Sequence, residues 1–184
     1  VTDIANANVA DTLRPRLVRS RLIPLAKPGG GVRPIAMGEV LLKVASRLAM
    51  QASAPDIRRV FNGTQYGVAC PAGLDIVVHT AREYLRGGAV GAPTMVTLDF
   101  CNAFNTPCRQ SMQNASSMVP TMRGIFHHEY ARPAELLLRD KQAGLHTVTS
   151  RRGSRQGSAA GPLFFCLVLQ HALNQASCVA GVRV

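Results

Sequence analysis

The sequence predicts a fold of the α+β class, and three observations carry this prediction. Apolar residues recur at helical spacing in several stretches, and between them lie short runs rich in Val, Ile and Thr that are bounded by Gly and Pro, as strands are. These runs do not alternate regularly with the helical stretches, which favours an α+β or mixed α/β fold over a sheet of βαβ units. With 184 residues, 47% of them hydrophobic, the chain is long enough to bury a core.

The first strands are expected in a hairpin. Two extended runs, Leu17–Ala26 and Val32–Met37, flank the Pro-Gly-Gly-Gly segment 28–31, a pattern that predicts a turn between paired strands. Pro24 and Pro34 have no backbone N–H to donate, so both strands should be irregular or lie at an edge.

The rest of the chain is expected to alternate helices with two further strands. Apolar spacing predicts helices over 38–53 (ended by Pro55), 74–85 (ended by Gly87-Gly88), 106–118 (opened by Thr106-Pro107), 122–131, 133–140 and 161–176. The apolar run 94–100 is predicted to be a buried central strand, and 144–150 a second strand. Segments 61–73 and 151–161 are rich in Gly and are predicted loops.

The charge balance favours a polyanionic partner. The net charge is +11 with a pI near 10.5, and nucleic acid is the first partner to consider. The five cysteines form no CxxC pair and lie mostly in apolar runs, as reduced thiols do, so an intracellular, nuclear or cytoplasmic location is expected. The longest apolar run is too short to cross a bilayer, so no membrane partner is expected.

Four motifs occur in an order and at a spacing that resemble a known enzyme family. They are "LIPLAKPGGGVRPIAM", "QYGVACPAGLD", "LDFCNAFN" and "RQGSAAGPLFF". Over roughly residues 20 to 184 the chain resembles the fingers and palm of a reverse transcriptase (RNA-directed DNA polymerase), most like those of non-LTR retrotransposons. "GVRPIAMGE" and "NAFN" are similar to the site-specific elements of trypanosomatids.

The resemblance implies a right-hand polymerase architecture with an antiparallel palm sheet backed by helices. It divides the chain into a lead-in segment (1–19), a fingers-like region (20–93) and a partial palm (94–184), with a fingers-type insertion around 120–150. The implied partners are an RNA template, a DNA primer and a dNTP.

Asp99 is the implied catalytic residue and metal ligand. A carboxylate at the tip of a rigid central strand suits Mg²⁺ (or Mn²⁺), which takes oxygen ligands, and nucleotidyl transfer uses two such ions. The alternative is that Asp99 only caps the turn into the next helix. Phe104 matches the family's steric gate against a 2′-hydroxyl, although a core Phe on an irregular turn is the alternative. Phe100, Cys101, Asn102 and Ala103 lie between ligand and gate, where backbone N–H groups can meet the triphosphate.

Basic and glycine-rich segments supply the other implied contacts. Lys27 and Arg33 match residues that swing over the nucleotide, and such cations neutralise charge in phosphoryl transfer; a solvated basic hairpin is the alternative. Gln156 and Gly157 match a contact to the nucleotide and template. Arg151, Arg152 and Arg155 are expected to hold the template backbone, and without the resemblance they are simply a basic loop.

The family also has a later pair of adjacent carboxylates, which this sequence lacks. No acid follows Asp140, and one carboxylate cannot hold two metal ions. We therefore interpret the chain as a piece of a longer protein and expect it to be inactive alone in primer extension. The alternatives are a non-catalytic nucleic-acid-binding relic, an RNA-dependent RNA polymerase palm, and a plain basic binding module.

The pair His127-His128 beside Glu129 has no partner Cys or His at ligand spacing. The sequence therefore predicts exposed helix histidines here and not a metal site.

Overall fold

The computed structural model describes residues 1–61, 63–88, 95–140, 142 and 144–176. Within these residues the fold is α+β, as predicted, and it combines eight α-helices with one mixed four-stranded sheet. The α-helices are α1 (Thr2–Ala5), α2 (Arg14–Val18), α3 (Val40–Ala52), α4 (Ala54–Phe61), α5 (Gly73–Glu83), α6 (Arg109–Ser116), α7 (Arg123–Tyr130) and α8 (Gly161–Ala176). No helix in this part of the chain is long and apolar enough to cross a membrane.

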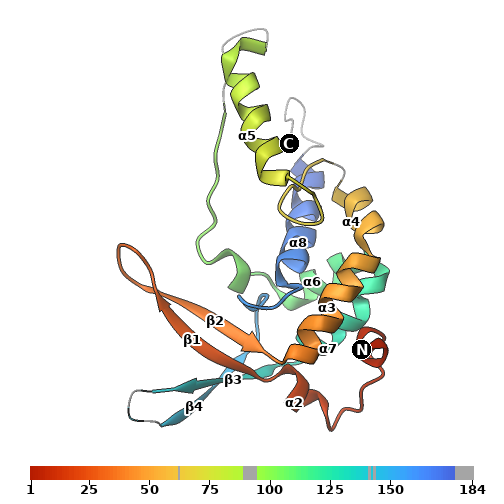
Figure 1. Cartoon of the computed structure of the whole chain (residues 1–184), viewed down its shortest axis with the longest axis vertical. Helices are drawn as coiled ribbons and strands as arrows, with labels where there is room; N and C mark the ends of the chain where they lie inside the picture. The colour runs from red at the N-terminus through yellow and green to blue at the C-terminus, as the bar shows by residue number, and fades with distance from the viewer. Residues whose placement is uncertain (62, 89–94, 141, 143, 177–184) are drawn as a thin grey trace.

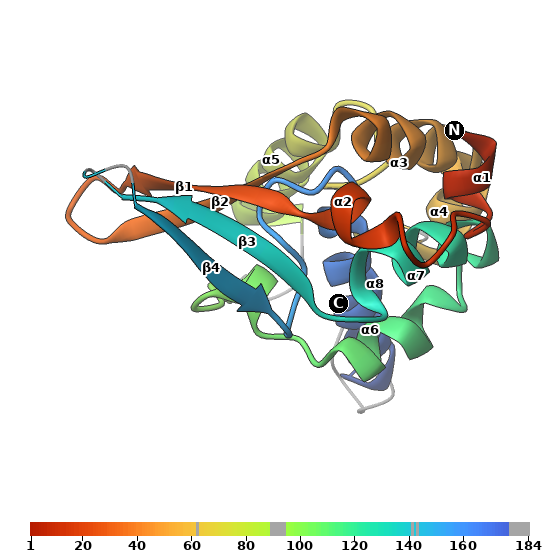
Figure 2. The same ribbon diagram turned by 90° about the horizontal axis from the view of Figure 1, so that it is seen from below.

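The sheet is built from two hairpins that meet through their inner strands. Its order is β2 (Val32–Gly38), β1 (Ser20–Ala26), β3 (Ala134–Arg139) and β4 (Leu145–Ser150). Each hairpin is antiparallel, but β1 and β3 run parallel to each other. The sheet that the structure describes is therefore mixed, whereas the resemblance implied an antiparallel sheet. Both hairpins project from the helices in the same direction (Figures 1 and 2).

The prediction of a helix over 133–140 was wrong. The segment "AELLLR" forms β3, although Ala, Glu, Leu and Arg all favour helices. Six residue pairs join it to β4, and Ser20 and Arg21 pair with Leu136 and Leu137 on the other side. Tertiary pairing on both edges outweighs the local preference.

The prediction of a buried strand over 94–100 was also wrong. Residue 94 lies outside the described residues, and 95–100 form no regular element and are exposed, with Leu98 77% accessible. A strand needs a neighbour for its backbone groups, and none of the four strands that the structure describes pairs with this segment. Figure 1 shows it as an extended trace that stands apart from the sheet.

Smaller differences concern the lead-in and the helix ends. The lead-in segment 1–19 packs on the rest of the chain, because α1 and α2 place Ile4 and Val18 in the core. The helix predicted from Thr106 begins at Arg109, after a short turn at Ala103–Asn105. Pro55 ends α3 as predicted and lies in the first turn of α4. A five-residue turn, Tyr84–Gly88, follows α5.

The core lies between α3, α4, α6, α7 and α8. Phe126, Tyr130 and Phe164 form an aromatic cluster in which Phe164 meets the other two edge to face, at centroid distances of 5.3 and 5.6 Å. A short turn at Pro120–Met122 leads into α7 and buries Met122. The aromatic cluster packs α7 against α8.

His127 is exposed, as predicted, but His128 is only 2% exposed and neither ring nitrogen has a hydrogen-bond partner among the described residues. Burial is the main cause that lowers the pKa of His128 below 6.5. The positive charges of His127, Arg14 and Arg132 lower this pKa further, and the negative charge of Asp11 opposes them. A lowered pKa in the folded state means that the unfolded state takes up the proton first.

We therefore expect stability to fall as the pH drops below about 6.5, the ordinary His pKa. Urea unfolding at pH 8 and pH 5.5 measures this. His128→Gln should flatten the pH dependence, whereas His127→Gln, the exposed neighbour, should not. An equal slope in His128→Gln and the parent protein would refute the assignment.

Candidate functional site

A cavity of about 150 Å³ opens where the β1–β2 hairpin meets the turn before α6 and the loop after β4. Three separated segments line it: the hairpin, the turn before α6 and the loop after β4. They contribute Lys27, Arg33, Asn102, Ala103, Phe104 and Gln156, which are six of the residues that the sequence predicts to bind nucleotide. We call this cavity the hairpin pocket.

The hairpin supplies the charge of the pocket. Gly29, Gly30 and Gly31 all adopt positive φ, which turns the chain so that the Lys27 N–H donates to the Gly31 carbonyl at 3.1 Å. Lys27 and Arg33 are exposed beside this turn, and neither forms an ion pair with any carboxylate in the described part of the chain. Two cations that face a cavity without an acidic neighbour favour an anionic ligand.

The turn before α6 is held by its own side chains. Asn102 has left-handed backbone (φ 53°), which Asn tolerates, and its side-chain oxygen accepts from Asn105 Nδ2 at 2.7 Å. Phe104 is half-buried and its ring packs on Phe165 of α8 at 5.1 Å. Phe104 therefore lines the pocket from a fixed position.

The loop after β4 ties the other two segments together. The Ala36 N–H on β2 donates to the Gln156 carbonyl at 2.7 Å, and the Ser154 N–H donates to the Phe104 carbonyl at 2.7 Å. Gly153 donates to the Pro107 carbonyl at 2.9 Å. Backbone hydrogen bonds thus set the spacing between the hairpin, the turn and Gln156.

Several predicted residues lie outside the lining of the pocket. Asp99, Phe100 and Cys101 are exposed on or beside the unpaired segment. Gly157 has φ of +112°, and a Cβ there would lie 2.5 Å from the Ala36 carbonyl oxygen. In this structure the close approach that Gly157 permits is therefore to β2.

Arg155 does not fit the prediction that it holds the template. It is 6% exposed, and its guanidinium pairs with Glu129 at 3.1 Å, where both side chains are buried. Arg151 and Arg152 are exposed, and Arg152 also donates to the Thr106 carbonyl at 3.4 Å. Only these two cations of the loop are placed to meet an outside ligand.

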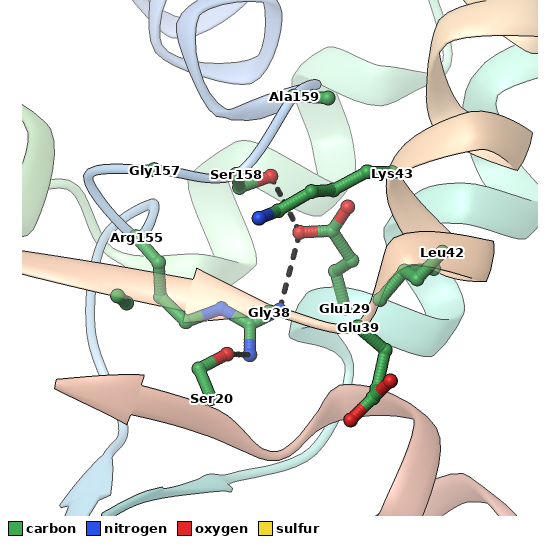
Figure 3. Close-up of a pocket in the computed structure, with 11 residues that line it drawn as sticks. Ser20, Gly38, Glu39, Leu42, Lys43, Glu129, Arg155, Gly157, Ser158 and Ala159 are labelled. Atoms are coloured by element: carbon green, nitrogen blue, oxygen red, sulfur yellow. Dashed lines mark hydrogen bonds and ion pairs between the residues drawn. The ribbon is translucent and has the colours of Figure 1, made fainter.

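Glu129 and Arg109 support the loop and were not predicted from the sequence. Glu129 accepts from Arg155, Ser158 and Ser46, and Figure 3 shows the first two of these contacts. Arg109 donates to Ser150 Oγ at 2.8 Å and to the Gly153 carbonyl at 3.4 Å, and burial lowers its pKa to about 10. Glu129 follows Ile125 and Phe126 at helical spacing, which is the signal that places it on the buried face of α7.

The described residues contain no group of three His, Cys, Asp or Glu side chains that could hold a metal ion. Asp99 can offer one carboxylate, which is too few ligands for Mg²⁺. The residues described here therefore do not by themselves fit a two-metal site.

Known proteins include one that is similar to this chain along most of its length. No protein-family model matches the chain. Over 171 residues, 91% of its length, the chain is 30% identical to the retrotransposable element SLACS 132 kDa protein of Trypanosoma brucei gambiense, of which it spans 14%. The chain is thus distantly related to a retrotransposable element protein of a trypanosome, which confirms the retroelement part of the predicted resemblance.

Proposed function

We propose that the chain is part of a reverse transcriptase of a non-LTR retroelement and that the hairpin pocket receives the incoming dNTP. The observation that carries this proposal is the convergence of Lys27, Arg33, Phe104 and Gln156, from three segments far apart in sequence, on one cavity. The relation to a retrotransposable element protein supports the same function.

Each pocket residue has a role that its chemistry fits. Lys27 and Arg33 attract the triphosphate and offset the charge that develops when the primer 3′-oxygen attacks the α-phosphorus and pyrophosphate leaves. Phe104, held by Phe165, occupies the place where a 2′-hydroxyl would have to fit. The backbone of Asn102 and Ala103 faces the phosphates, and Gln156 faces the nascent base pair.

In this proposal Asp99 remains one ligand of Mg²⁺ or Mn²⁺, which would assist the attacking and leaving oxygens when bound. The described residues do not by themselves complete such a site. An RNA template and a DNA primer are the proposed partners, with Arg151 and Arg152 on the phosphate backbone.

We expect the chain to bind a fluorescent dNTP in the presence of Mg²⁺. Lys27→Ala and Arg33→Ala should each weaken this binding about tenfold, because a hydrogen bond to a charged group contributes about 1.5–3 kcal/mol. Equilibrium fluorescence titration gives the dissociation constant of the parent chain and of each variant. Arg58→Ala removes an exposed cation of α4 outside the pocket and is the matched control.

The second candidate, a nucleic-acid-binding relic, is favoured by the incomplete metal site and the net charge of +11. Salt-sensitive binding of a primer–template duplex without any dNTP binding would select the relic and reject the pocket. The hairpin pocket would also be rejected as the dNTP site if Arg58→Ala lost as much dNTP affinity as Lys27→Ala.

A further inference from the structure

A buried ion pair lies where the start of β1, the end of β2, α3, α7 and the loop after β4 meet (Figure 3). Arg155 and Glu129 meet at 3.1 Å with side chains that are 5% and 3% exposed. The same carboxylate oxygen accepts from Ser158 Oγ at 2.6 Å, and the other oxygen accepts from Ser46 Oγ at 3.2 Å. Glu129 therefore accepts from two residues of the loop after β4, and more weakly from Ser46 of α3, whose hydroxyl also lies 2.7 Å from the Leu42 carbonyl oxygen.

The guanidinium of Arg155 also holds the start of the hairpin. Its second terminal nitrogen donates to the Val18 carbonyl at 2.5 Å and to Ser20 Oγ at 3.3 Å, where β1 begins. One side chain thus joins α7, through Glu129, to the strand that leads to Lys27.

The next residue after Arg155 is Gln156, whose carbonyl accepts the Ala36 N–H of β2. Both sides of the hairpin pocket, the hairpin and Gln156, are therefore tied to the position of the Arg155 side chain. That position depends on Glu129, the one carboxylate that accepts from Arg155 among the described residues.

We propose that Glu129 is a positioning residue for the hairpin pocket, which fixes Arg155 and Ser158 and through them the spacing between Gln156 and the β1–β2 hairpin. The proposal rests on the proposed function, since it names what orders the nucleotide site. Glu129 itself does not line that pocket, so it acts through other residues.

The chemistry of the contact favours positioning over simple stabilisation. Packing an apolar pair of similar volume into a buried site often gives as much stability as an ion pair, because both charges must leave water. A carboxylate that accepts directed hydrogen bonds instead fixes the angles and distances of the groups around it. Here those groups come from the loop, from α3 and, through Arg155, from β1.

The experiment compares Ser158→Ala and Glu129→Gln with Ile125→Val, a conservative change at another buried position of α7. Amide hydrogen exchange followed by NMR reports the Ala36 N–H, which donates to Gln156. Exchange of the Phe164 N–H, in the core helix α8, reports global opening. In Ser158→Ala, the milder variant, we expect the exchange rate of the Ala36 amide to rise about tenfold relative to that of Phe164. In Glu129→Gln the rise should be larger. Ile125→Val should change the exchange of both amides equally.

Affinity for a fluorescent dNTP should fall about fivefold or more in Ser158→Ala and remain at the parent value in Ile125→Val. An unchanged ratio of Ala36 to Phe164 exchange in Ser158→Ala would overturn the positioning role. If the parent chain binds no dNTP, the proposed function fails, but the exchange ratio still decides whether Glu129 orders the loop. If Glu129→Gln does not fold, the exchange ratio in Ser158→Ala decides the question. That variant removes only one donor to Glu129 and leaves the buried ion pair in place.

Discussion

Replacing Gly153 with alanine is expected to destabilise the protein by about 3 kcal/mol or more and to abolish dNTP binding in the hairpin pocket. Gly153 has φ of +60°, and a Cβ there would lie 2.3 Å from the Phe104 carbonyl oxygen and within 2.5 Å of two backbone atoms of Asn105. These neighbours are main-chain atoms, so no rotamer change can relieve the clash. The loop after β4 must move away from the turn that carries Phe104.

Gly87→Ala is the matched control for this variant. Gly87 also has positive φ (+104°), but a Cβ there would meet no heavy atom within 4 Å. Its substitution carries the backbone penalty alone, about 1 kcal/mol, and should leave dNTP affinity unchanged. Urea unfolding and nucleotide titration of both variants separate the two effects. Similar losses in both would show that the contact between Gly153 and the 104–105 backbone does not set the pocket.

The sequence predicts the local elements of this protein better than their partners. The hairpin around the Gly turn, the helices α3 and α5 and the apolar helix α8 follow directly from spacing and turn residues. The segment "AELLLR" became a strand because β1 and β4 lie on either side of it, and no local pattern contains that fact. The same limit explains 95–100, where the composition of a strand is present but a pairing neighbour is not.

The candidate site shows a similar division. Lys27, Arg33, Phe104 and Gln156 were predicted from motifs, and the structure brings them to one cavity. Arg155 looked like its neighbours Arg151 and Arg152, because burial is not visible in a basic loop. Its partner Glu129 lies in another element, 26 residues away. What the sequence conceals is which polar side chains are turned inward to meet each other.

Tyr130→Ala is expected to lower the free energy of unfolding by about 3–5 kcal/mol, the usual cost of removing a fully buried aromatic side chain. The Tyr130 ring packs on Phe126 and Phe164, and the guanidinium carbons of Arg109 and Arg155 lie 5.5 and 5.4 Å from its centre. Arg109 contacts the end of β4 and the start of the following loop, and Arg155 belongs to that loop, so the variant should weaken dNTP binding as well as stability.

Tyr130→Phe keeps the ring and removes only the hydroxyl, which accepts the Arg155 N–H at 3.3 Å. It should cost about 1 kcal/mol and leave the stacking of both arginines intact. Chemical denaturation and nucleotide titration of the two variants test this division. If Tyr130→Phe lost as much affinity as Tyr130→Ala, the hydroxyl contact would be what fixes the loop. Equal stability of Tyr130→Ala and the parent protein would instead mean that the ring does not hold α7 against α8. The expected result, a large effect of the ring and a small one of the hydroxyl, would place the support of the pocket in the packing of Arg109 and Arg155 on the Tyr130 ring.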